Sequence, residues 1–195
     1  MPVNTANEPN IPGFLFNAML NPLIPYSIKG AIWYQGEANT GQAYQYRELM
    51  PLMIKDWRDR WGYDFPFYMV QLASFTAQQT APVDATWAEL REAQTRTLHL
   101  ANTGMAVTID IGDAFDIHPK NKQEVGRRLA LAARAQTYGE KIPYSGPMYD
   151  TYQMEGNKIR IYFKHTDGGL KTANNEVIRD LPLPVLIINF IGLML

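Results

Sequence analysis

An aspartate and a histidine two residues apart form the most chemically suggestive pair in this sequence. Asp116 and His118 share a loop with Asp113, and Pro119 follows the histidine. A carboxylate can orient an imidazole and stabilise its protonated form, so that the imidazole accepts a proton from a hydroxyl nucleophile and returns it to the leaving group. The pair therefore indicates acid–base catalysis. A solvated loop aspartate beside a helix-capping histidine is the alternative.

A second polar loop contains residues suited to stabilising negative charge. Gln35, Gly36, Glu37 and Asn39 directly follow a short apolar run. Glycine permits a tight turn that exposes backbone N–H groups, and the two amide side chains are the neutral donors that a tetrahedral oxyanion requires. An ordinary turn leading into a helix, capped by Asn39 or Thr40, accounts for the same residues equally well.

The elements that must position these loops alternate between strands and helices. Short apolar runs predict the strands, and apolar residues at three- and four-residue spacing predict the helices. The expected order is strand 28–34, helix 46–61, strand 65–72, helix 87–100, strand 104–111 and a helix from 119–122 to 138. We expect Pro51 to kink or interrupt the first helix, and Gly62 and Gly139 to end the first and the third.

This alternation predicts a parallel sheet with both polar loops at one edge. Consecutive strand–helix–strand units form parallel sheets, and ligands bind beyond the carboxyl ends of their strands. Loops 35–39, 71–74 and 110–118 all leave those ends. The sheet would bring the Asp–His pair to the amide loop. The same arrangement allows an alternative function, in which Glu37 and Asp116 form a carboxylate pair that hydrolyses glycosidic bonds.

The pattern changes after residue 147 to that of an antiparallel hairpin. Strands 149–154 and 158–164 flank a turn in which Gly156 suits a two-residue connection. We expect residues 1–146 to form the main α/β part and 147–180 the start of a second β module. The apolar tail 181–195 is atypical, and it is shorter than the roughly 20 residues of a membrane-spanning helix.

Composition excludes several classes of protein. The chain has 195 residues, a formal net charge of −1 and no cysteine, which rules out disulfides and thiolate catalysis. No basic stretch indicates nucleic acid as a partner, and nothing indicates a membrane. Without a paired-histidine motif, no metal or cofactor is expected. Residues 1–10 lack the features of a signal peptide. The lack of cysteine leaves the compartment open, since many secreted bacterial proteins also have no disulfide.

Two longer motifs carry a resemblance to a known family. The stretches GAIWYQGEAN (residues 30–39) and DIHPKNKQEVGRR (residues 116–128) resemble blocks of the sialate O-acetylesterases, and the likeness extends over about residues 10–175. It implies an α/β/α fold of the SGNH/GDSL type. It also implies hydrolysis of acetyl esters on sugars, with an acetylated sugar or glycan as the partner and no cofactor. Relatives of this kind are often exported.

The resemblance also implies roles for individual residues. His118 would be the general base, and Asp116 would orient it, with Asp113 as the alternative acid. Gln35 would donate to the oxyanion. The rest of its loop would shape the same site through Gly36, Glu37 and Asn39.

The family's nucleophile has no counterpart in the sequence. It is a serine in a Gly-Gln-Ser-Asn block upstream of both motifs, and no such block is present. Of the three serines, Ser74 alone lies at the predicted carboxyl edge of the sheet. The residues around it do not form the kind of turn that presents a nucleophile. We therefore expect the C-terminal part of a catalytic domain, truncated and inactive alone, or complemented by an N-terminal fragment. A non-catalytic carbohydrate-binding remnant is the alternative.

Overall fold

The α/β class predicted from the sequence is confirmed. The computed structural model describes residues 11–77, 84–166, 169–170 and 187–190. Its helices and strands are β1 (Ala31–Trp33), α1 (Ala43–Trp61), β2 (Phe67–Val70), α2 (Thr86–Arg96), β3 (Thr103–Ala106), α3 (Lys122–Gln136), β4 (Met148–Glu155), β5 (Lys158–Lys164) and β6 (Ile187–Phe190). Strands and helices alternate up to α3, and strands alone follow.

The first three strands form a parallel sheet in the order β1-β2-β3. Ile32 pairs with Tyr68, which in turn pairs with Gly104. A Cβ at Gly104 would lie 2.6 Å from the Tyr68 ring. Glycine there lets the tyrosine ring lie across the neighbouring strand.

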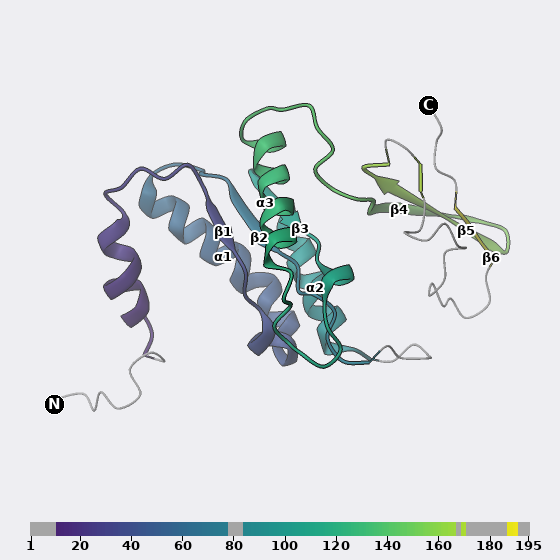
Figure 1. The fold of residues 1–195 in the computed structure, drawn as a ribbon, viewed down its shortest axis with the longest axis horizontal. Coiled ribbons are helices and arrows are strands. Elements are labelled where there is room, and N and C mark those ends of the chain that lie inside the picture. The colour runs from purple at the N-terminus through teal and green to yellow at the C-terminus, as the bar shows by residue number, and fades with distance from the viewer. Residues whose placement is uncertain (1–10, 78–83, 167–168, 171–186, 191–195) are drawn as a thin grey trace.

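Helices cover the two faces of this sheet. Because successive side chains of a strand point to opposite faces, β2 contributes to two separate cores. Phe67 and Met69 pack with buried residues of α1 and α2, whereas Tyr68 and Val70 pack with Leu129 and its neighbours on α3. Figure 1 shows α3 on the near side of the sheet and α1 behind it. The predicted three-layer arrangement is thus present around three strands.

Helix α1 departs from one prediction and meets another. It runs through Pro51 without interruption, so the expected restart there is wrong. Met50 and Ile54, on either side of the proline, are buried in the core, and this packing holds the helix across one missing hydrogen bond. Gly62 ends the helix as predicted, with φ 78° and its N–H bonded to the Arg58 carbonyl.

Strand β3 is shorter than predicted. It ends at Ala106, and Ile109–Ile111 form a 3₁₀ turn in place of the expected strand. After Ala106, side-chain hydrogen bonds take the place of backbone bonds between strands. Arg128 donates to the Val107 carbonyl at 2.6 Å, and the Thr108 hydroxyl donates to the Gln71 carbonyl at 2.6 Å. Because the strand ends early, the loop that contains Asp116 and His118 leaves the sheet sooner than predicted.

The second sheet begins with the predicted hairpin. β4 and β5 pair antiparallel, with Gly156 at φ 62° in the turn, and β6 pairs parallel to β5. Figure 1 shows this sheet beside the α/β layers. Most of the predicted tail 181–195 lies outside the described residues, and the proposed division into three parts stays a prediction. Over the described ranges, no helix has the length and apolar character needed to cross a membrane.

Candidate functional site

The structure brings the two predicted loops together at the carboxyl edge of the parallel sheet. A hollow of about 170 Å³ lies between the loop after β1 and the loop after β3. Its lining residues are Tyr34, Glu37, Ile117, His118, Pro119 and Lys122. Of the residues proposed from the sequence, Glu37 and His118 therefore face the same space. Gln35, Gly36, Asn39, Asp113 and Asp116 lie in the two loops without lining it.

Asp116 is the acid that contacts the histidine. One of its carboxylate oxygens accepts from the His118 backbone N–H at 2.9 Å and lies 3.4 Å from the imidazole Nδ1. The first of these contacts is the main reason that the pKa of Asp116 lies below its usual value, which keeps the carboxylate ionised. The His118 side chain is 85% exposed. With Nδ1 beside Asp116, Nε2 is the nitrogen available to a reactant.

Asp113 has a different local partner. Its carboxylate accepts from the Phe115 N–H at 2.9 Å, which closes a turn within the loop. This geometry favours Asp116 over Asp113 as the orienting acid, although the role itself stays a prediction.

The loop after β1 holds its amides in a hydrogen-bonded chain. The Tyr46 hydroxyl donates to Gln35 Oε1 at 3.2 Å, and Gln35 Nε2 donates to Asn39 Oδ1 at 2.7 Å. Since Asn39 Oδ1 is an acceptor here, its Nδ2 group is the end of the chain that remains available as a donor. The sequence predicted a shaping role for Asn39, and the geometry adds a second amide donor beside Gln35.

Gly36 permits the sharp turn of this loop. Its φ of 147° lies in a region that side chains rarely adopt. A Cβ at this position would also lie 3.1 Å from Leu90 Cδ2 on α2. Both the backbone conformation and the close approach to α2 require glycine.

Two polar residues of the hollow, Tyr34 and Lys122, have no role in the sequence-based prediction. Lys122 Nζ lies 4.8 Å from the centre of the Tyr34 ring, so a cation–π contact joins the start of α3 to the exit of β1. Burial raises the pKa of Tyr34, and the Glu37 carboxylate raises it further, so the phenol stays neutral. Because His118 lies in the loop before α3, helical spacing does not relate it to Lys122, and only the folded arrangement places both beside the hollow.

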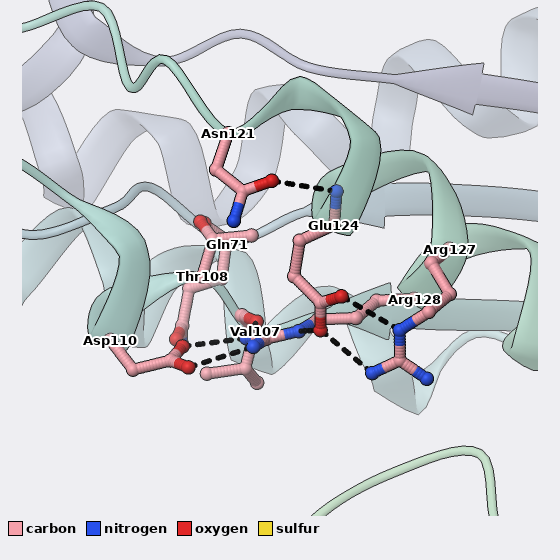
Figure 2. A network of polar contacts seen from close by, with 8 residues as sticks. All are labelled: Gln71, Val107, Thr108, Asp110, Asn121, Glu124, Arg127 and Arg128. Atoms are coloured by element: carbon pink, nitrogen blue, oxygen red, sulfur yellow. Dashed lines mark hydrogen bonds and ion pairs between the residues drawn. The ribbon is translucent and has the colours of Figure 1, made fainter.

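Figure 2 shows a polar network that fixes both ends of the histidine loop on α3. Arg128 donates to the two carboxylate oxygens of Asp110 at 2.6 and 2.7 Å, and its Nε donates to Glu124 at 2.7 Å. Arg127 also donates to Glu124. At the far end of the loop, Asn121 caps α3 by accepting from the Glu124 N–H at 3.1 Å.

This network makes a prediction about acid stability. Hydrogen bonds from Arg127 and Arg128 lower the pKa of Glu124 from 4.5 to about 2. A carboxylate whose pKa is lower in the folded state stabilises the fold above its unfolded pKa, and this contribution is lost as the pH falls through the folded value. The melting-temperature gap between the native chain and Glu124→Gln should therefore be largest above about pH 4.5 and shrink towards pH 2. A gap that stays constant from pH 7 to pH 2 would contradict this assignment.

Ser74 lies on the rim but is not paired with the histidine. Gly112, in the histidine loop, packs directly on it, because a Cβ there would lie 2.1 Å from the Ser74 carbonyl oxygen. All three serines fall within the described residues, and none has its hydroxyl hydrogen-bonded to His118. Within the same part of the chain, no cluster of three or more His, Asp or Glu side chains is arranged to hold a metal.

Comparison with known proteins identifies a family and a fold. The family model described as a carbohydrate esterase, sialic acid-specific acetylesterase, matches residues 14–135. The chain belongs to this family. Sialate O-acetylesterases from mouse and human are 38% and 33% identical to it over 154 and 178 residues, which cover 69% and 81% of this chain.

A solved structure extends the likeness to the fold. A carbohydrate acetylesterase from Xanthomonas citri is 46% identical and superimposes with a TM-score of 0.75 over 82% of this chain. The chain spans 38% of that protein and 28% and 34% of the mouse and human esterases, or about a third of each.

Proposed function

We propose that this chain supplies the base and the oxyanion donors of a carbohydrate O-acetylesterase, a serine-type hydrolase of the sialate 9-O-acetylesterase kind. His118 would deprotonate a serine hydroxyl, and Asp116 would keep the imidazole oriented and stabilise it when protonated. Gln35 and Asn39 would donate to the tetrahedral oxyanion. The observation that carries this proposal is that Glu37 of the amide loop and His118 line the same hollow at the sheet edge.

The serine nucleophile, in this proposal, comes from polypeptide outside this sequence. No serine of the chain is hydrogen-bonded to His118, and the family relatives are about three times longer. An oxyanion site and a base without a nucleophile leave little acyl transfer, so the chain would be inactive or weakly active alone. Together with the polypeptide that carries the serine, the chain would act on an acetylated sugar or glycan.

The open edge of β1 is where we propose that this polypeptide docks. β1 pairs with β2 on one side and has no partner among the described strands on the other. Ile32, at the centre of β1, is 71% exposed although its cross-strand neighbour Tyr68 is buried against α3. An unpaired edge with an exposed aliphatic side chain invites another strand. A strand added there would end beside the Gln35 loop.

A chimera tests the proposal. The part of the Xanthomonas citri enzyme that precedes its match to this chain, which by the family resemblance carries the Gly-Gln-Ser-Asn block, is joined in front of residue 11. We expect the chimera to release acetate from O-acetylated sialic acid or from acetylated xylan, because it has nucleophile, base and oxyanion donors in one sheet. Acetate release is measured for the chimera and for the chain alone.

Two variants of the chimera control for trivial outcomes. Alanine at the serine of the introduced block should abolish acetate release, and Ile32→Lys should impair assembly at the β1 edge. An inactive but folded chimera that still binds the acetylated sugar would favour the carbohydrate-binding alternative instead.

A further inference from the structure

Gln94 on α2 is a buried amide beneath the candidate oxyanion loop. Its side chain is 2% exposed, among the least exposed polar groups of the described chain. A buried amide is tolerated where its hydrogen-bonding capacity is met, so its partners show which parts of the structure it holds.

Those partners are backbone groups at the ends of β1 and β2, where the chain leaves each strand. Gln94 Nε2 donates to the Gln35 carbonyl at 3.1 Å and to the Val70 carbonyl at 3.4 Å, and Oε1 accepts from the Leu72 N–H at 2.9 Å. Val70 is the last residue of β2, and Gln35 opens the loop after β1. One side chain therefore sets the spacing between the two loops on this part of the rim.

The same side chain also contacts the start of the loop whose Gln35 and Asn39 amides are hydrogen-bonded to each other. A Cβ at Gly36 would lie 3.1 Å from Gln94 Nε2, so the turn rests directly on this amide. Gln94 holds the Gln35 backbone, while Tyr46 and Asn39 hold the Gln35 side chain. Hydrogen bonds thereby fix both the position of the Gln35 backbone and the orientation of its side-chain amide.

We infer that Gln94 is a positioning residue for the oxyanion donors Gln35 and Asn39. This inference rests on the proposed esterase function and adds to it a residue that does not touch the substrate. Oxyanion stabilisation depends on donors that are already aimed before the reaction. Without the bond from Gln94, the Gln35 carbonyl would keep only the longer contact from the Tyr46 hydroxyl at 3.5 Å. We therefore expect the carbonyl and the Gly36 turn to shift, and both amides with them.

The experiment uses Gln94→Glu and Gln94→Met. Methionine keeps the length and volume without hydrogen bonds, so it removes the bond to the Gln35 carbonyl at any pH. Glutamate keeps the acceptor for Leu72 and loses the donor to Gln35 only when it is ionised, because a protonated carboxyl still donates. Thr97→Val is the matched control. Thr97 is fully buried just beyond the end of α2 and donates to the Ala93 carbonyl at 3.5 Å, with no bond to either loop.

The first readout is the ¹⁵N–¹H NMR signals of the Gln35 and Asn39 side-chain amides in the full chain. We expect both Gln94 variants to shift these signals and Thr97→Val to leave them in place. The second readout is turnover by the active chimera, in which kcat should fall by about tenfold or more while KM changes little, because only transition-state stabilisation is lost.

Unchanged Gln35 and Asn39 signals in the folded Gln94→Met variant would overturn the inference. So would equal shifts in Thr97→Val, which would mark a merely structural role. If the unsubstituted chimera releases no acetate, the proposed function fails separately, and the NMR signals still decide whether Gln94 holds the two amides.

Discussion

Replacing Gly112 with alanine should destabilise the chain by about 1–3 kcal/mol or more and disorganise the rim. The added Cβ would lie 2.1 Å from the Ser74 carbonyl oxygen and 2.6 Å from its amide nitrogen, so backbone rather than a flexible side chain must move. Gly112 has φ −75° and ψ 174°, which alanine adopts freely, so the effect is steric alone. Chemical denaturation of the two proteins measures the difference.

Gly126 provides the matched control for this substitution. It lies inside α3, and a Cβ there would meet nothing within 4 Å. Gly126→Ala should stabilise the chain by about 0.5–1 kcal/mol, because alanine favours helix over the unfolded state. Equal effects of the two substitutions would show that the loops after β2 and β3 are not packed as the structure has them.

The second large effect is expected at His118. In the active chimera, His118→Ala should lower kcat by about 10²- to 10⁴-fold, the usual contribution of a positioned general base. The fold should be unaffected, because the imidazole is 85% exposed. Hydrolysis of p-nitrophenyl acetate and the melting temperature are measured on the same preparations.

Asp116→Asn is the companion variant, since it keeps the shape of the side chain and removes its charge. It should lower kcat as well, although less than His118→Ala, and Asp113→Asn should have little effect. A larger loss from Asp113→Asn would exchange the roles of the two acids.

The sequence was sufficient to predict the layers and the rim because both depend on periodic patterns. Apolar runs and helical spacing located β1 to β3 and α1 to α3, and parallel topology then required both polar loops to leave one edge. The failures were local. The end of β3 is decided by Arg128 and Thr108, which contact groups far along the chain, and no pattern around residue 107 reveals that.

The same limit applies to the site. The Asp–His pair and the amide loop could be identified from residue type, since their chemistry is evident from local sequence. Gln94 could not, because a glutamine in a helix is usually exposed and only its burial beneath Gly36 gives it a role. The cation–π contact of Lys122 with Tyr34 likewise joins two segments almost ninety residues apart, and it requires the folded sheet.

The most direct test of the central claim is hydrolysis of p-nitrophenyl acetate by the purified chain alone, compared with its His118→Ala variant. We expect equal rates, because the base has no serine of this chain within hydrogen-bonding reach. Turnover by the native chain that the substitution abolishes would contradict the account. It would mean that a nucleophile lies within this sequence, with Ser74 or a water activated by His118 as the next group to examine.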